Sequence, residues 1–208
     1  MTQTVLITGA ASGLGNVIAR HLLTQGFQVV LTDVDAARAE AAAAELDSDN
    51  VLALGLDIRQ PEDFDAALAA TVARFGSLHA LVNNAALTLA TPVMDITVDE
   101  FDRVISTNLR GTFVGCQTMG RYFASRGYGR IINLASLAGQ NGGTASGAHY
   151  AASKGGILTL TKVFARELAK SGVTVNAIAP GPMDLPTVHA LVPEEKMAGL
   201  LQMIPVGA

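Results

Sequence analysis

The sequence of 208 residues contains one cysteine, no tryptophan and few aromatic residues, which make up 5% of the chain. The single Cys116 excludes an intrachain disulfide, and with the scattered His21, His79, His149 and His189 it gives no spacing typical of a zinc site. We therefore expect no bound metal, and a protein of the reducing cytoplasm.

An excess of charge of one sign and long apolar runs are also missing. Lys and Arg total 14 against 18 Asp and Glu, with no basic run, which argues against a nucleic-acid partner or an anionic lipid surface. Apolar stretches are interrupted every few residues, well short of the roughly 20 residues that a membrane span needs. The N-terminus shows neither the basic segment nor the cleavage site of a signal peptide, so we expect no membrane partner.

Hydrophobic residues make up 50% of the chain and follow a repeated pattern. Short β-branched runs alternate with longer Ala- and Leu-rich segments of helical period, and no linker or internal repeat divides them. This pattern predicts one α/β domain over residues 1–208, with βαβ units around a parallel sheet. The expected strands are 5–8, 28–32, 51–56, 80–83, 130–134 and 174–178, and helices are expected to begin near Leu14, Ala36, Pro61, Val98 and Tyr150.

The segment 180–204 departs from this alternation. It is rich in proline and apolar residues, and it lies past the carboxyl end of a strand, where open α/β sheets bind ligands. Long irregular segments in compact domains tend to be functional, so we interpret 180–204 as a substrate lid. A surface excursion without function is the alternative.

Glycines cluster between the first strand and the first helix, where Thr8 to Gly15 read TGAASGLG. Such glycines permit a tight turn, let the backbone approach a pyrophosphate and leave the helix N-terminus free to stabilise its charge. A lone glycine triplet is a weak signal, but its position between strand and helix in the first βαβ unit indicates a dinucleotide-binding loop. We expect a dinucleotide here, with a purely structural turn as the alternative.

Asp33 follows the second expected strand. A carboxylate there accepts hydrogen bonds from the adenosine ribose but repels a 2′-phosphate, so it favours NAD over NADP. Ser12, Val34 and Asp35 supply no basic group for an extra phosphate. The alternative is that Asp33 only helps to start a helix.

Asp57 and Asn84 follow the third and fourth expected strands, at the ligand edge of the sheet. Asp57 could bond the adenine amino group, and Asn84 with the backbone after it could line the ribose. Turn formation explains both residues equally well.

Tyr150 and Lys154 lie four residues apart, hence one turn apart on one face of a helix. A free tyrosine has a pKa of about 10, and a nearby ammonium lowers it toward the range of a general acid or base. This spacing alone is common on helix surfaces. Ser136 strengthens it, because the topology brings the end of the fifth strand beside this helix. Asn108, a polar residue in an otherwise amphipathic helix, needs a buried partner.

Several motifs occur together in the order found in one family. They are a TGxxxGxG loop, an NNAG-like segment at 83–86, the residues Asn108, Ser136, Tyr150 and Lys154, and the pair Pro180-Gly181. From Val5 to its last residue the chain resembles the short-chain dehydrogenase/reductase family. The resemblance implies a Rossmann-fold doubly wound parallel sheet, and hydride transfer between nicotinamide C4 and a secondary alcohol or ketone.

The resemblance also implies a role for each matching residue. Tyr150 would be the catalytic acid or base, and Lys154 would lower its pKa and bond the nicotinamide ribose. Ser136 would polarise the carbonyl or alcohol, and Asn108 would hold a water of a proton relay behind Lys154. The cofactor-binding residues implied besides Tyr150 and Lys154 are Gly9, Ser12, Gly13, Leu14, Gly15, Asp33, Asp57, Ile58, Asn84, Ala85, Ala86, Pro180 and Gly181.

Three features depart from the family's pattern. Ala86 replaces a glycine, so the backbone near the ribose must tolerate a Cβ. Leu185 stands where the family has a threonine that bonds the nicotinamide carboxamide, with Thr187 nearby. The chain stops at Ala208, where relatives continue into a helix and a seventh strand that also build a subunit interface. We therefore expect a truncated or incompletely recorded chain of a homo-oligomer, a tetramer or a dimer.

These observations favour an NAD(H)-dependent dehydrogenase or reductase that acts on a small secondary alcohol or ketone. A 3-oxoacyl-carrier-protein reductase is the alternative within the family, although such enzymes usually prefer NADPH. A non-catalytic NAD-binding or sensing protein is the alternative outside it. The apolar segment 180–204 hints at a hydrophobic substrate without identifying it.

Overall fold

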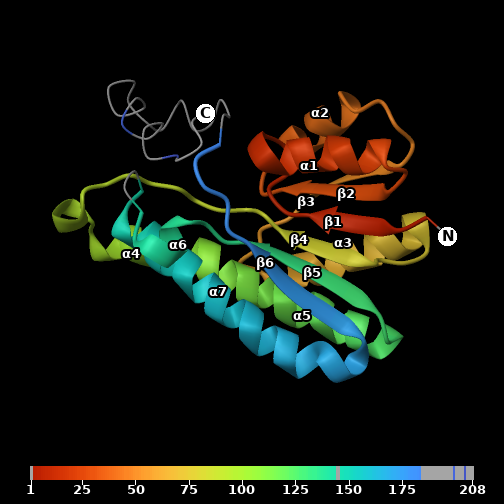
Figure 1. Ribbon diagram of the computed structural model, residues 1–208. Helices are drawn as coiled ribbons and strands as arrows, with labels where there is room; N and C mark the ends of the chain where they lie inside the picture. The colour runs from red at the N-terminus through yellow and green to blue at the C-terminus, as the bar shows by residue number, and fades with distance from the viewer. Residues whose placement is uncertain (1, 144–145, 184–198, 200–203, 205–208) are drawn as a thin grey trace.

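Six parallel strands form one sheet in the order β3-β2-β1-β4-β5-β6 in the computed structural model, which describes residues 2–143, 146–183, 199 and 204 (Figure 1). The chain passes from β3 at one edge back to β4 beside β1, so the two halves of the sheet are wound in opposite directions. This is the doubly wound arrangement expected from the sequence. The strands are β1 (Thr4–Ile7), β2 (Gln28–Asp33), β3 (Val51–Gly55), β4 (Ala80–Asn83), β5 (Gly129–Leu134) and β6 (Val173–Ile178).

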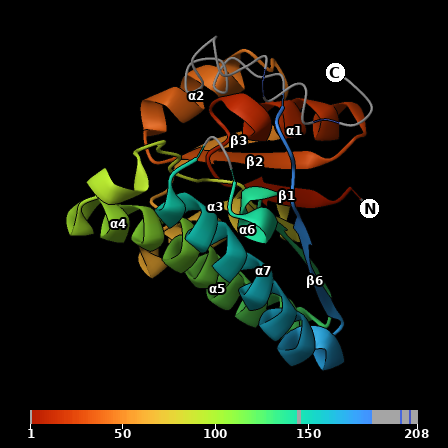
Figure 2. The same cartoon turned by 60° about the vertical axis from the view of Figure 1, so that its left-hand side comes forward.

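Helices cover both faces of the sheet and give three layers (Figure 1, Figure 2). The first two helices pack on one face, and α3, α5 and α7 pack on the other. This arrangement follows from right-handed crossovers between parallel strands. The helices are α1 (Gly13–Thr24), α2 (Ala36–Ala44), α3 (Pro61–Phe75), α4 (Val98–Ile105), α5 (Gly111–Arg126), α6 (Ala138–Asn141) and α7 (Ala148–Leu168), with short helical turns η1 (Val93–Asp95), η2 (Ser106–Arg110) and η3 (Ala169–Ser171).

The sheet is buried on both sides, as parallel sheets are when helices cover them. All four residues of β1 are buried, and so are five of the six in β2. Phe64 and Phe123 fill the core on the side of α3 and α5, and Ile7 and Leu31 belong to the core under α1 and α2. The two cores hold the carboxyl ends of the central strands at one fixed edge.

Capping residues in the sequence explain where several helices begin. The Asp35 carboxylate accepts hydrogen bonds from the backbone N–H groups of Ala37 and Arg38 at the start of α2. Thr97 caps α4 in the same way, and α3 begins with Pro61, whose position needs no N–H donor. The predicted starts of these three helices are confirmed, and every strand bound agrees to within one residue.

Two helical features differ from the prediction. The pattern after Val98 predicts one continuous helix, whereas the structure has the π-helical turn η2 between α4 and α5. The predicted start near Tyr150 agrees with α7, which begins at Ala148, but the sequence did not predict the short α6 before it. A single extra residue in a turn barely changes hydrophobic periodicity, so the π turn leaves no clear signal in the sequence.

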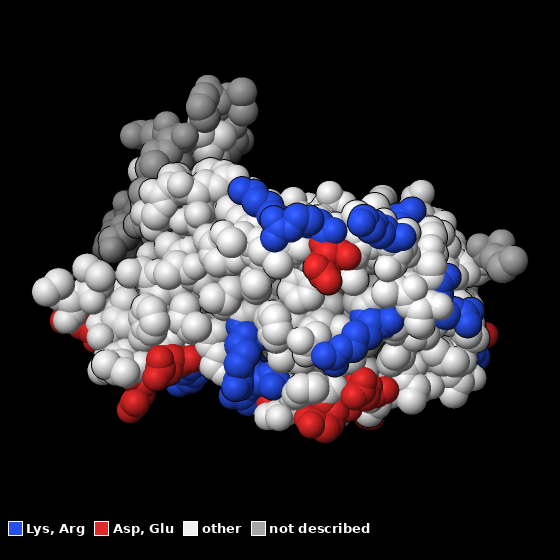
Figure 3. Space-filling view, turned by 90° about the horizontal axis from the view of Figure 1, so that it is seen from below, with Lys and Arg blue, Asp and Glu red and all other residues white. Residues whose placement is uncertain are grey.

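The predicted lid at 180–204 lies outside the described residues except for 180–183, 199 and 204, and Leu185 and Thr187 lie outside them as well. Within the described ranges, no helix is long and apolar enough to cross a membrane, and no group of three His, Cys, Asp or Glu could hold a metal ion. Seen from below, on the side of α5 and α7, basic side chains cover more surface than acidic ones, although the chain's net charge is −4 (Figure 3).

Candidate active site

A cleft with a volume of about 760 Å³ lies at the carboxyl edge of the sheet, where β1 and β4 lead away in opposite directions. This switch point is where doubly wound sheets bind ligands. Of the predicted site residues, Gly15 and Asn108 do not line the cleft. Those that do line it are Gly9, Ser12, Gly13, Leu14, Asp33, Asp57, Ile58, Asn84, Ala85, Ala86, Ser136, Tyr150, Lys154, Pro180 and Gly181.

The glycine loop forms the floor of the cleft at the start of α1. Gly9 and Gly13 have φ angles of 63° and 57°, which side chains rarely tolerate. A Cβ on Gly15 would lie 2.6 Å from both Nδ2 of Asn84 and the carbonyl oxygen of Gly9, so this turn has no room for a side chain. The first turn of α1 has no acidic residue and no side-chain cap. Its N–H groups and this close backbone fit a dinucleotide pyrophosphate.

Thr8, the first residue of the TGxxxGxG motif, joins the glycine loop to the end of β4 through its side chain. Its buried hydroxyl accepts hydrogen bonds from the N–H groups of Asn84 and Ala85, both at 3.0 Å. In return, Nδ2 of Asn84 donates to the carbonyl oxygens of Thr8 and Gly9 at 2.9 and 3.0 Å. The Asn84 amide thus holds the loop in place while the residue lines the cleft.

Replacing Thr8 by valine is expected to lower the free energy of unfolding by about 1–3 kcal/mol, because two partly buried N–H groups lose their acceptor. NADH affinity should fall with it, since the loop loses its anchor to β4. Thr8→Ser, which keeps the hydroxyl, is the matched control and should stay close to wild type. Urea unfolding and NADH titration of the three proteins measure both effects; equal stability of Thr8→Val and Thr8→Ser would contradict the role given to the hydroxyl.

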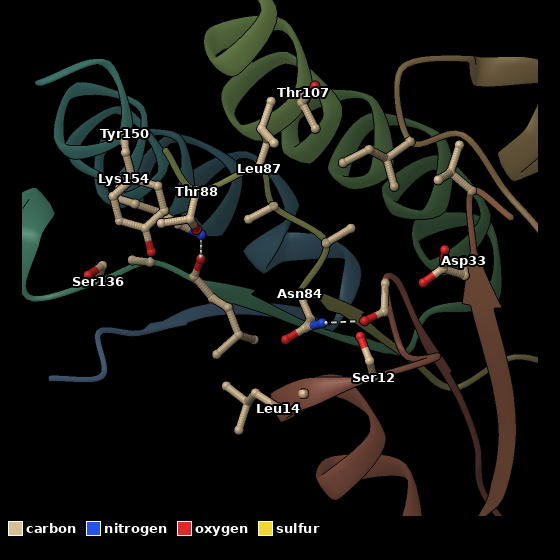
Figure 4. A pocket seen from close by; sticks show the side chains of 18 of the residues that line it. Ser12, Leu14, Asp33, Asn84, Leu87, Thr88, Thr107, Ser136, Tyr150 and Lys154 are labelled. Carbon is tan, nitrogen blue, oxygen red and sulfur yellow. Dashed lines mark hydrogen bonds between the residues drawn. The ribbon is translucent and has the colours of Figure 1, made fainter. Parts of the chain in front are cut away.

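Asp33 lies at the end of the cleft away from Tyr150, with its side chain 10% exposed (Figure 4). Nη1 of Arg38, in the first turn of α2, is 3.8 Å from its Oδ1, and Nη2 of Arg38 donates to the Ser12 hydroxyl at 3.3 Å. Ser12, Val34 and Asp35 supply no basic group, as the sequence shows, but Arg38 brings one from further along the chain. The Asp35 cap starts a helical turn that places Arg38 over the end of β2.

Asp57 is paired within its own turn. Nη2 of Arg59 lies 2.6 Å from Oδ2 of Asp57, and Nε of Arg59 bonds both carboxylate oxygens. The pKa of Asp57 is lowered, chiefly by these hydrogen bonds. A bond from Asp57 to an adenine amino group stays a prediction, and the carboxylate would share it with Arg59. Ile58 is mostly buried and packs against Gly111 of α5, where a Cβ would lie 2.6 Å from its Cδ1.

Ser136, Tyr150 and Lys154 meet at the other end of the cleft, and Thr88 lies beside them (Figure 4). The pKa of Tyr150 is raised, because burial outweighs its hydrogen bonds with Ser136 and Thr88. The sequence predicted a lowered pKa instead. The difference arises because Nζ of Lys154 lies 5.6 Å from the centre of the tyrosine ring and donates to the carbonyl oxygen of Leu134. In this arrangement the phenol is neutral at neutral pH.

Lys154 is buried in the first half of α7, with 3% of its surface exposed. Its Nζ donates to the Leu134 carbonyl oxygen at 2.6 Å. Burial lowers its pKa from 10.5 to about 8. The amino group therefore stays charged at neutral pH only against a large desolvation penalty, which a partner in the cleft would relieve.

Asn108 lies in the π turn η2 and is fully buried. Its Oδ1 accepts from the Leu87 N–H at 2.7 Å, and its Nδ2 donates to the Leu87 carbonyl oxygen and to the Ser153 hydroxyl. The buried partners expected for Asn108 thus lie in the segment after β4 and in α7. The side-chain amide of Asn108 already bonds Leu87 and Ser153, and these bonds do not test whether Asn108 holds a water. The water predicted behind Lys154 therefore stays a prediction.

Proteins of known sequence and structure resemble this chain along most of its length. A model of the short chain dehydrogenase family matches residues 3–196. The chain is 37% identical to a 2-dehydro-3-deoxy-L-rhamnonate dehydrogenase (NAD(+)) of Sphingomonas sp. (strain SKA58), over 97% of this chain and 80% of that protein. It is also 37% identical to a 3-oxoacyl-[acyl-carrier-protein] reductase of Staphylococcus aureus (strain Mu50), over 98% and 83%. A crystal structure of 3-ketoacyl-(acyl-carrier-protein) reductase from Brucella melitensis complexed with NADH superposes with a TM-score of 0.90 at 32% identity, covering 99% of this chain and 84% of that one.

A doubly wound sheet with a glycine loop at its switch point, and a Ser-Tyr-Lys cluster at the same edge, defines an oxidoreductase that uses a nicotinamide dinucleotide. The chain belongs to the short-chain dehydrogenase family. The family and the fold class predicted from the sequence are thereby confirmed.

Proposed function

We propose that the protein catalyses NAD(H)-dependent interconversion of a secondary alcohol and a ketone, with Tyr150 as general acid and base. The observation that carries the proposal is the convergence of Ser136, Tyr150 and Lys154 at one end of a cleft whose other end holds the glycine loop and Asp33. A dinucleotide laid along this cleft would have its pyrophosphate at α1 and its reactive ring beside the phenol.

The bound nicotinamide supplies or accepts the hydride. In ketone reduction, the neutral phenol of Tyr150 donates a proton to the carbonyl oxygen, and the Ser136 hydroxyl donates a hydrogen bond to the same oxygen. The Lys154 ammonium, released from Leu134 by a ribose hydroxyl, would stabilise the phenolate that remains. In alcohol oxidation the phenolate takes the proton back.

Titration of the protein with NADH and with NADPH, followed by turnover of a panel of secondary alcohols with NAD+, tests this proposal. We expect tighter binding of NADH and turnover of at least one apolar alcohol. The absence of tryptophan leaves nicotinamide fluorescence free of overlap. Cofactor binding without turnover of any alcohol or ketone would favour a non-catalytic NAD-binding protein.

The position of Arg38 favours a second cofactor assignment, because its guanidinium lies between Asp33 and Ser12 and could pair with a 2′-phosphate bound beside it. A 3-oxoacyl-carrier-protein reductase that uses NADPH is therefore the second candidate function. Preference of the wild-type protein for NADPH would overturn the assignment to NAD and favour this candidate.

Replacing Asp33 by asparagine is expected to raise NADPH affinity by about tenfold, because removal of the carboxylate leaves Arg38 free to pair with the 2′-phosphate. Fluorescence titration with both cofactors measures the change. Arg38→Gln in the Asp33→Asn background is the matched control and should abolish the gain. An unchanged NADPH affinity in Asp33→Asn would show that Asp33 does not select the cofactor.

We further propose a cytoplasmic homo-oligomer. The single Cys116 is buried and its pKa is raised to about 12, so it stays a thiol that packs like a small apolar residue. A free thiol suits the reducing cytoplasm.

The proposed contact between copies involves exposed aromatic side chains. Phe101 and Phe113 on α4 and α5 are 41% and 38% exposed, which suits a contact with a second copy. Light scattering of the purified protein tests the oligomeric state.

A further inference from the structure

The residue before Tyr150 is completely buried and makes two hydrogen bonds through its ring. Nδ1 of His149 accepts from the backbone N–H of Tyr150 at 2.9 Å. Nε2 of His149 lies 2.9 Å from Oε1 of Glu100 in α4. A chain of contacts thus runs from α4 through the imidazole to the backbone of Tyr150.

The first of these bonds determines the tautomer of His149. A backbone N–H can only donate, so Nδ1 must carry the lone pair and Nε2 must carry the proton. Nε2–H then donates to the Glu100 carboxylate, whose pKa is lowered by hydrogen bonds from Thr91 and His149. An ionised acceptor strengthens this bond and holds the ring in one orientation.

His149 replaces a missing helix cap. The N-cap of α7 is Gly147, which has no side chain to satisfy the N–H groups of the first turn. A Cβ on Gly147 would lie 2.7 Å from Nδ1 of His149, so the ring occupies the place of a capping side chain. The N–H that it satisfies belongs to Tyr150, in the turn that aims the phenol at Ser136.

Glu100 is itself held firmly. Its backbone N–H donates to the Thr97 hydroxyl that caps α4, and α4 packs against α7. We propose that Glu100 and His149 form a positioning pair that fixes the first turn of α7, and with it the phenol of Tyr150, for proton transfer. This role rests on the proposed function of Tyr150. Neither residue touches the reacting atoms.

Two replacements of His149 separate its two bonds. His149→Asn places an oxygen near the position of Nδ1 and keeps the acceptor for the Tyr150 N–H. The longer side chain of His149→Gln can still bond Glu100, but it leaves the Tyr150 N–H without its acceptor. We expect kcat to fall about tenfold or more in His149→Gln, which loses the acceptor, and in Glu100→Ala, in which the imidazole is no longer held in one orientation. It should stay within about threefold of wild type in His149→Asn, whose short side chain holds the acceptor in place without Glu100. The Kd of NADH should be unchanged in all three. Asp99→Ala, at the exposed neighbour of Glu100 in the same turn, is the matched control.

A second measurement needs no substrate. The chain has three tyrosines and no tryptophan, so the ultraviolet absorbance of tyrosinate, corrected with Tyr150→Phe, reports the titration of Tyr150 alone. Burial is the main cause of its raised pKa. Loosening the turn in His149→Gln should therefore move the pKa of Tyr150 back down, while His149→Asn should leave it in place.

The two readouts distinguish the possible failures. If the wild-type protein turns over no alcohol or ketone, the proposed function fails, and the phenol titration alone decides whether the pair positions Tyr150. If His149→Gln and Glu100→Ala lose thermal stability but keep kcat and the Tyr150 titration of wild type, the pair serves packing only and the inference is overturned.

Discussion

Replacing Tyr150 by phenylalanine is expected to lower kcat by about 10³-fold while leaving NADH affinity unchanged, because the substitution removes one hydroxyl from the end of the cleft opposite the glycine loop. The phenol is a titratable group of the cleft that lies beside Ser136, and its raised pKa keeps it protonated at neutral pH. Steady-state kinetics with the best alcohol or ketone, together with NADH titration, measure both quantities.

Tyr128→Phe is the matched control for this prediction. Tyr128 is 36% exposed and its hydroxyl pairs with Gln3, far from the cleft, so its loss should leave both kcat and NADH affinity at wild-type values. Wild-type kcat in Tyr150→Phe would remove Tyr150 from the reaction. Loss of NADH binding in the same variant would show instead that the phenol holds the cofactor.

The edge of the sheet and most of the cleft could be predicted because their signals are local. The glycine loop that follows β1 places a turn at the carboxyl edge, and Asp33 lies at the same edge because it ends β2. Parallel pairing then brings all strand ends together without any knowledge of side-chain contacts. For the same reason Ser136, at the end of β5, and Tyr150, on the helix after it, were expected to meet.

The contacts that organise the site could not be predicted, because each joins residues far apart in the chain. The Thr8 hydroxyl bonds the backbone of Asn84, and Glu100 bonds His149. Periodicity reports which face of a helix is apolar but not which polar group across the core will meet it. The raised pKa of Tyr150 belongs to this class as well, since it depends on burial and on where the amino group of Lys154 points.

The burial of Lys154 indicates that the site is built at the expense of stability. Its ammonium is desolvated in α7 and has one described hydrogen bond, to the Leu134 carbonyl oxygen. A pKa lowered from 10.5 to about 8 corresponds to an upper value of about 3 kcal/mol. The lost hydrogen bond to Leu134 would offset about 1 kcal/mol of any gain on removing the amine. Groups kept at such a penalty are typical of functional sites.

Replacing Lys154 by methionine is therefore expected to raise the free energy of unfolding at pH 7 by about 1–2 kcal/mol and to abolish turnover. The gain should depend on pH in a definite direction. Below pH 8 the folded wild-type protein carries the buried charge and bears the full penalty. Between pH 8 and 10.5 the unfolded chain binds the proton more tightly than the folded one, so wild-type stability rises with pH and the advantage of the variant disappears.

Urea unfolding of the cofactor-free proteins between pH 7 and 10.5 measures this difference. Lys162→Met is the matched control, because Lys162 lies on the same helix two turns further along and is exposed. It should change stability little at any of these pH values. A Lys154→Met variant that is less stable than wild type at pH 7, with no trend toward higher pH, would show that the amino group stabilises the apo protein. A more stable but inactive variant would instead show that the positive charge is maintained beside Tyr150 for the reaction, since folding alone disfavours it.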